Sequence, residues 1–203
     1  MSTTKKLTIA VIALSVALVC VVSGTLAFLV AQSNVVTNTF TYGGIEIELT
    51  EDEKNNTTGM EFTNVIPGDV LTKEPVVTVK AGSEKCYVYV LITNELGKAA
   101  TYNISTEDWT TVQTNGNSVL YRYKEVVNTT SAAADCAVFT ELKFATTLDK
   151  AAIGDLAGKD VIIQAYAHQA ENLVENDSDN PITVADAAAN AWMTKVLTPT
   201  QSN

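Results

Sequence analysis

Residues 86–92 read Cys-Tyr-Val-Tyr-Val-Leu-Ile, and this run decides the fold class. Five of its seven residues are β-branched or aromatic, and such residues favour extended strands. Both faces of such a strand are apolar, so both must be covered by other parts of the protein. We therefore predict a central strand of a β-sheet at this place.

Similar short apolar runs lie on both sides of this strand. Residues 45–49 follow Gly43-Gly44 and alternate strictly between apolar and acidic, which is typical of a strand with one face on a core. Asn115-Gly116-Asn117 is a strong hairpin signal because Asn and Gly tolerate the positive φ that a tight turn needs. The other predicted strands lie at 76–79, 102–105, 109–114, 118–127, 138–144 and 161–169. This spacing predicts an all-β fold, a jelly-roll-like two-sheet sandwich.

One short helix is predicted near residues 184–196. Thr183 and Asp186 have the spacing of a capping box, and strong helix formers follow them. Trp192 and Val196 lie four residues apart, so one face of the helix is apolar. We expect this face to pack on the sandwich.

The N-terminus has the pattern of a secretion leader. Lys5 and Lys6 precede an uncharged run, and small residues at 23–27 favour cleavage between Ala27 and Phe28. We predict a signal peptide at 1–27, an N-terminal segment at 28–42, a sandwich domain at 43–203 and a secreted protein. Two alternatives are a retained membrane anchor, since the uncharged run is long enough to cross a bilayer of about 30 Å, and a lipoprotein acylated at Cys20.

The charge of the chain is strongly negative. It has 13 basic and 23 acidic residues, a formal net charge of −10, and Arg122 is its one arginine. Such a surface repels phosphate backbones, so we predict no nucleic-acid partner.

Two cysteines remain once the leader is removed. Cys86 and Cys136 form an even pair in an exported chain, which predicts one disulfide. The alternative is two free, buried thiols that behave as small hydrophobic residues.

The sequence has few residues suited to catalysis. His168 is the one histidine, so a zinc site with two histidines on one helix face cannot be built. Asp177, Asp179 and Asn180 offer hard oxygen ligands for calcium, but the segment lacks the glycine and the final bidentate Glu of an EF-hand, which favours a solvated turn leading into the helix. We predict neither an enzymatic activity nor a cofactor.

Several segments, taken in order, resemble the TasA/camelysin family of Gram-positive exported proteins. They are Gly24-Thr25-Leu26-Ala27-Phe28, 36–43, Ile66-Pro67-Gly68-Asp69, 73–79, 83–90, 165–170 and Ala191-Trp192. The resemblance implies a jelly-roll subunit of biofilm matrix fibres. It also implies processing by a SipW-type signal peptidase, a head-to-tail polymer of the chain with itself, and an anchor or accessory matrix protein as a further partner.

In TasA-like fibres, the segment after the cleavage site is donated as a strand to the neighbouring subunit. Residues 28–42 are uncharged and extended in character, so they allow this mechanism, with Val35 and Phe40 filling core positions. The candidate donor-strand residues are Phe28, Val30, Val35, Val36 and Phe40. Alternatively, residues 34–42 form the first strand of their own sandwich.

Two other functions stay open. Camelysin-like relatives are classed as metallopeptidases, which gives an enzyme alternative. A monomeric surface module could instead bind a carbohydrate or an adhesion target through Trp109, Tyr121 and Tyr123, although aromatic residues in strands usually belong to a core.

Overall fold

The computed structural model describes residues 44–51, 65–173 and 180–198. The chain divides into two units, Met1–Thr41 and Tyr42–Asn203, and all of the described residues belong to the second unit. The predicted leader and the predicted donor segment lie outside the described residues.

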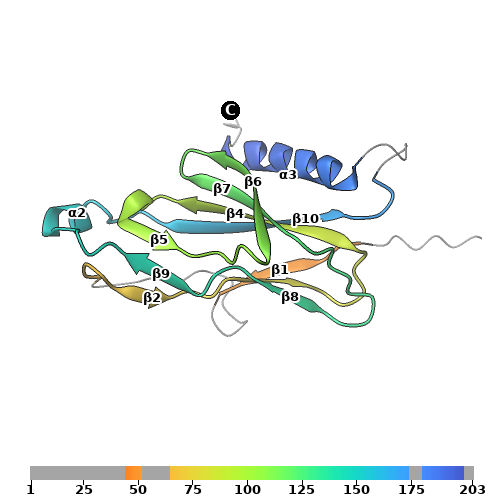
Figure 1. Cartoon of the computed structure of the whole chain (residues 1–203), viewed down its shortest axis with the longest axis horizontal. Coiled ribbons are helices and arrows are strands. Elements are labelled where there is room, and N and C mark those ends of the chain that lie inside the picture. The colour runs from red at the N-terminus through yellow and green to blue at the C-terminus, as the bar shows by residue number, and fades with distance from the viewer. Residues whose placement is uncertain (1–43, 52–64, 174–179, 199–203) are drawn as a thin grey trace, which may run out of the picture. The chain divides into compact units, whose positions relative to one another are not determined.

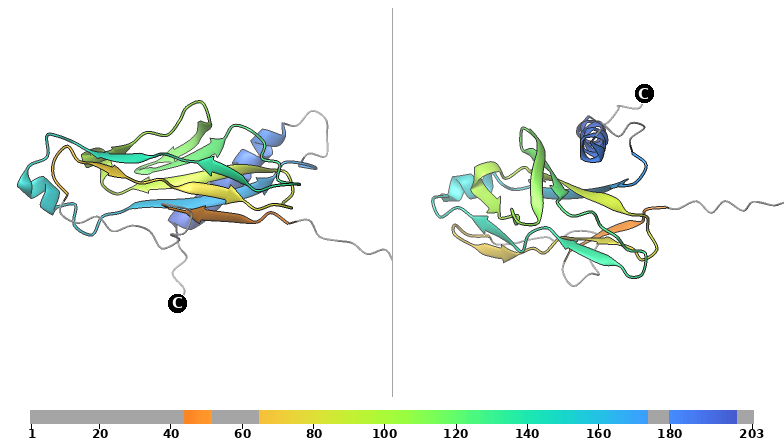
Figure 2. Two further views of the ribbon diagram at one scale, coloured as in Figure 1. Left: turned by 90° about the horizontal axis from the view of Figure 1, so that it is seen from below. Right: turned by 45° about the vertical axis from the view of Figure 1, so that its right-hand side comes forward.

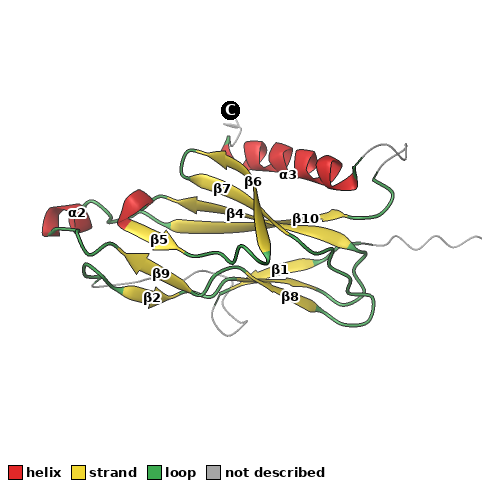
Figure 3. Cartoon of the chain, in the orientation of Figure 1, coloured by secondary structure: helices red, strands yellow, loops and turns green. Residues whose placement is uncertain are grey.

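The described residues of the second unit form ten strands and three helical segments (Figures 1 and 3). The strands are β1 (Ile47–Thr50), β2 (Val70–Thr72), β3 (Val76–Val79), β4 (Cys86–Asn94), β5 (Ala100–Tyr102), β6 (Trp109–Asn115), β7 (Ser118–Tyr123), β8 (Ala134–Ala137), β9 (Glu141–Phe144) and β10 (Val161–Gln169). The helical segments are the short 3-10 turn η1 (Gly97–Ala99), α2 (Lys150–Gly154) and α3 (Pro181–Leu197).

The largest sheet has four strands in the order β10-β4-β7-β6, with antiparallel pairing throughout. The predicted central strand is β4, whose residues from Cys86 to Ile92 are all buried. The predicted Asn-Gly hairpin joins β6 to β7, and Gly116 has a φ of 58°. The central position of 86–92 and the hairpin are therefore confirmed.

The second layer of the sandwich, which packs against the four-stranded sheet, contains two three-stranded sheets, β1-β3-β8 and β2-β9-β5. The pairing of β3 with β8 continues the pairing of β2 with β9 without a shift in register. Val70 pairs with Lys143, and Val76, six residues later, pairs with Ala137, six residues earlier. Between them the ladder loses a donor at Pro75, which has no N–H, although the Val138 N–H still donates to the Pro75 carbonyl at 3.0 Å. The two sheets are thus one long ribbon interrupted at a proline.

A main core fills the space between the four-stranded sheet and this ribbon. It contains the even-numbered side chains of β4 together with residues of β3, β6 and β8. Its fully buried aliphatic members include Val77, Val79, Val88, Val90 and Ile92. The all-β sandwich is therefore confirmed.

Helix α3 covers the other face of the four-stranded sheet (Figure 2). Ala185, Ala189 and Met193 pack on the odd-numbered side chains of β4, which confirms the C-terminal helix and its packing. The predicted cap at Thr183 is wrong. The helix begins at Pro181, three residues before the predicted start at 184. Pro181 suits the first helical position, and the Asn180 side chain caps the helix by accepting a hydrogen bond from the Ile182 N–H at 3.0 Å.

A polar contact fixes α3 on the sheet. Arg122 Nε lies 3.0 Å from Asp186 Oδ1, as an ion pair without good hydrogen-bond alignment, and the Tyr89 hydroxyl donates to the same oxygen at 2.9 Å. Burial and the neighbouring Asp186 carboxylate raise the pKa of Tyr89 above its ordinary value, so the hydroxyl remains a donor.

No helix in the described part of the chain is long and apolar enough to cross a membrane.

The contact between Asp186 and Arg122 gives a test of how α3 is held. Asp186→Ala leaves Arg122, whose side chain is 12% exposed, without its partner. We expect the free energy of unfolding to fall by about 3 kcal/mol, because a buried charge loses its counter-ion. Glu171→Ala removes the exposed ion pair with Lys85 and should change the free energy by less than about 0.5 kcal/mol. Equal effects of the two substitutions in urea unfolding would contradict this account.

Candidate assembly edge

The most unusual surface of the sandwich is the outer edge of β10. This strand is outermost in its sheet and pairs with β4 along all nine of its residues, from Val161 opposite Asn94 to Gln169 opposite Cys86. Among residues 44–51, 65–173 and 180–198, no strand pairs with its other side. β10 therefore presents a long row of backbone groups to which another strand can bond.

The other edge strands of the described sheets are protected or short. β6, at the opposite edge of the same sheet, is rich in polar residues and has a bulge between Thr111 and Gln113. The edge strands β1, β2, β5 and β8 have only three or four residues each. By contrast, β10 has no irregularity in its pairing and contains no proline and no Lys, Arg, Asp or Glu. Bulges, charges and prolines are the usual protection of an edge against pairing, and β10 lacks all three.

The hydrogen bonds at both ends of β10 show which backbone groups point outward. The Ala170 N–H donates to the Lys85 carbonyl at 2.8 Å, and the Glu95 N–H donates to the Asp160 carbonyl at 3.0 Å. In an antiparallel ladder alternate residues bond to one neighbour, so the even-numbered residues of β10 bond to β4. The N–H and C=O groups of Ile163, Ala165 and Ala167 therefore point to the free edge.

The side chains of these odd-numbered residues face the main core, which is open along this flank. Ile163, Ala165 and Ala167 are only partly buried, whereas Val88 and Val90 on the neighbouring strand are 0% exposed. The apolar residues in and just before β1 are also only partly buried, and β1 comes close to β10, as Figure 1 shows. The edges of both sheets thus leave apolar core surface accessible to solvent.

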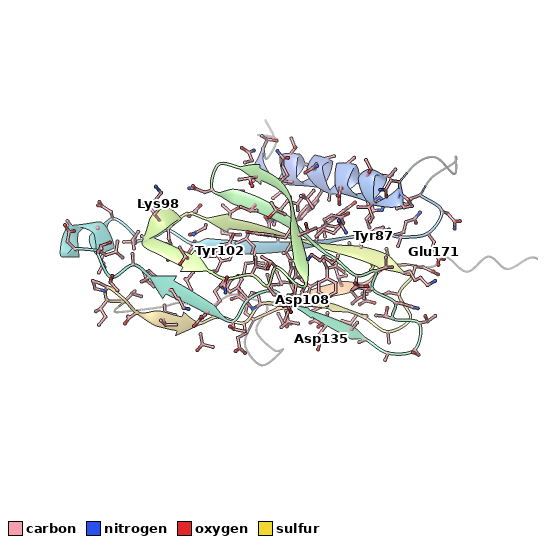
Figure 4. The ribbon with its side chains drawn as sticks, in the orientation of Figure 1. Tyr87, Lys98, Tyr102, Asp108, Asp135 and Glu171 are labelled. Carbon is pink, nitrogen blue, oxygen red and sulfur yellow. The ribbon has the colours of Figure 1, made fainter. Side chains whose placement is uncertain are left out.

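The opposite flank of the core is closed by aromatic rings. Trp109 is buried, donates its Nε1–H to the Ala137 carbonyl at 2.8 Å and packs edge-on against Tyr123. Tyr102, labelled in Figure 4, stacks on Phe139 with 5.1 Å between the ring centroids. Tyr121 packs against the same core. The three aromatic residues considered as a ligand site therefore serve the packing of this flank.

His168 lies on the other face of β10, beside α3. Its Nδ1 is 3.0 Å from the Gln169 carbonyl oxygen, and its ring lies 6.2 Å from that of Tyr166. Tyr166 in turn stacks on Trp192 of α3, at 5.2 Å between centroids. Across residues 44–51, 65–173 and 180–198, no group of three His, Cys, Asp or Glu side chains is placed to hold a metal ion.

Cys86 and Cys136 come together from opposite sheets. Both are free thiols in the structure, both are buried, and both belong to the main core. Burial raises the pKa of Cys86 to about 11, and burial followed by the proximity of Cys86 raises the pKa of Cys136 to about 12. The disulfide stays a prediction, and the thiols as placed are poor nucleophiles.

Of the other residues predicted for calcium binding, cleavage and strand donation, the structure describes only Asn180. The Asn180 side chain caps α3, while Asp177 and Asp179 lie outside the described residues. The cleavage residues Ala27 and Phe28 and the donor residues Val30, Val35, Val36 and Phe40 also lie outside them. These assignments therefore stay predictions.

The sequence predicted the strand at 161–169 with its bounds but not its position at an edge. The sequence offered one signal of an edge, since the small residues Ala165 and Ala167 follow Ile163 at alternate positions of a strand without charges. An uncharged, apolar strand is equally typical of the centre of a sheet, so the pattern did not separate the two positions. The ion pair between Arg122 and Asp186 was also missed, although a single arginine in an acidic chain was a visible signal.

A family model described as camelysin metallo-endopeptidase matches residues 2–180 of the chain. No curated protein and no solved structure matches it. The match covers the ten strands of the described residues and ends just before α3. The described residues do not fit the metal that this description implies, because their one histidine belongs to no group of three His, Cys, Asp or Glu side chains that could hold a metal ion.

The raised thiol pKa values give a test of the cysteine pair. At pH 8 neither thiol should react with iodoacetamide in the folded protein, because both are buried and protonated. After unfolding of the mature protein, which lacks Cys20, without reductant, mass spectrometry should find no label if the predicted disulfide exists and two labels if the thiols are free. Labelling of either cysteine in the folded protein would contradict their burial.

Proposed function

The chain belongs to the camelysin metallo-endopeptidase family, and we propose that it is a secreted structural subunit of extracellular matrix fibres. Each subunit donates its N-terminal segment, residues 28–42, as a strand to the next copy. A SipW-type signal peptidase releases this segment by cleavage after Ala27.

The free edge of β10 is the observation that carries this proposal. Exposed, regular edges promote strand addition between chains, so soluble proteins commonly protect them. Here the long edge lacks a bulge, a charge and a proline, while the other edge of the same sheet has a bulge. An edge of this kind supports pairing with an added strand through main-chain hydrogen bonds.

The N-terminal segment has the composition that such an edge requires. Residues 28–42 include no charged side chain, and their fifteen residues exceed the nine of β10. An extended strand rises about 3.3 Å per residue, so the segment is long enough to pair along the whole edge. Because the donor and the acceptor are different parts of the chain, each contact is head-to-tail and produces an open filament.

Removal of the donor gives the direct test of this proposal. We expect a chain that lacks residues 28–39 to fold and to remain monomeric, because the described sandwich begins after this segment. Val36→Pro should weaken assembly by removing one ladder donor, whereas Val36→Ile keeps the N–H and an apolar branched side chain and should still assemble. The measurement is electron microscopy together with light scattering of the mature protein. Filaments of normal length from the deleted chain would refute strand donation.

The family description favours a second candidate, a metal-dependent peptidase. In that case the purified protein should cleave casein, a chelator should stop the cleavage, and His168→Ala should abolish it. We expect no chelator-sensitive cleavage from the wild-type protein and unchanged assembly of the His168→Ala variant. Cleavage that is lost both with a chelator and in His168→Ala would make the peptidase the better assignment.

A further inference from the structure

We propose that Ala165 and Ala167 form the sockets on β10 that receive alternate side chains of the donated strand. This inference rests on the proposed function and specifies its acceptor site. Both alanines face the main core, and both have backbone groups that point to the free edge. One pair of residues therefore supplies main-chain bonds and room for side chains at the same place.

The neighbouring strand shows that these positions lack side-chain volume. Ala165 lies opposite Val90 and Ala167 lies opposite Val88, and both valines are fully buried. The two alanines are only partly buried, although they face the same core. Protein cores are closely packed, so small, partly exposed residues at core-facing positions leave apolar surface that another side chain can cover.

The other wall of this flank is also apolar. Ile47 lies opposite Val79 and Leu49 lies opposite Val77 in the facing sheet, and both residues are only partly buried. β1 approaches β10 here, and Figure 2 shows the two strands at neighbouring edges of the two layers. A strand added along β10 would therefore cover the partly buried apolar side chains of β1 as well as those of β10.

The chemistry of the flank favours residues 28–42 of a second copy as its occupant. The flank lacks charged side chains on β10, and the segment has none. In an extended strand, residues of equal parity share a face, so Phe28, Val30, Val36 and Phe40 would lie on one side of the donated strand. Val35 falls on the opposite side, so we assign the socket-filling role to the even-numbered residues.

Filling the sockets tests this assignment. Ala165→Leu and Ala167→Leu place side chains of the acceptor where the donor would enter. We expect each variant to fold with a thermal midpoint equal to or above that of the wild type, since apolar surface is covered, and to form no filaments. The matched control is Gln164→Leu on the opposite face of the same strand, which should assemble as the wild type does.

Mixing two variants separates the acceptor from the donor. A chain with Ala167→Leu keeps its donor segment, and a chain without residues 28–39 keeps its sockets. Neither should polymerise alone, whereas together they should form a one-to-one complex in size-exclusion chromatography with light scattering. Absence of this complex would overturn the assignment.

The outcomes distinguish this inference from the proposed function. If the wild-type protein forms no filaments, both are refuted. If the wild type assembles and the two leucine variants assemble equally well, strand donation stands and the sockets are refuted. A large loss of thermal stability in the leucine variants would also refute the sockets, because it would show that the positions are already filled.

Discussion

The fold depends on the burial of both faces of β4. Its even-numbered side chains, such as Val88 and Val90, enter the core between the sheets, and its odd-numbered side chains, such as Tyr89 and Leu91, enter the core under α3. A strand that is apolar on both faces requires a layer on each side, so the ribbon of short strands and the C-terminal helix are two consequences of one sequence feature. The contact of Asp186 with Arg122 and Tyr89 then fixes the position of the helix on its face.

With both faces of the central sheet covered, the edges remain as the places where another chain can pair. The two flanks of the main core differ in the size and burial of the side chains that close them. Large rings such as Trp109 and Phe139 close one flank, whereas Ala165 and Ala167 leave the other partly open. A sandwich optimised as a monomer would place larger residues or charges at such an edge. The open flank is therefore the feature of this fold on which the proposed assembly rests.

Much of the fold could be predicted from the sequence, because local patterns carried it. The strand at 76–79, the strand at 161–169 and the turn at Asn115-Gly116-Asn117 depend on residue type and on periodicity, and the structure has them where the sequence placed them. The short strands β2 and β8 were missed because three or four residues in a loop-like composition become strands only by pairing with their neighbours. The edge position of β10 was missed for a related reason, since strand order is set by tertiary pairing and not by the strand itself.

Hydrogen exchange at single backbone amides tests the central claim most directly. The amides of Ile163, Ala165 and Ala167 point to the free edge, so they should exchange rapidly in the monomer. In the assembled protein the same three amides should become strongly protected, while those of Tyr166 and His168, which point toward β4, should be protected in both states. Equal exchange of the three outward amides in the monomer and in the assembled protein would contradict the claim that the next subunit pairs with this edge.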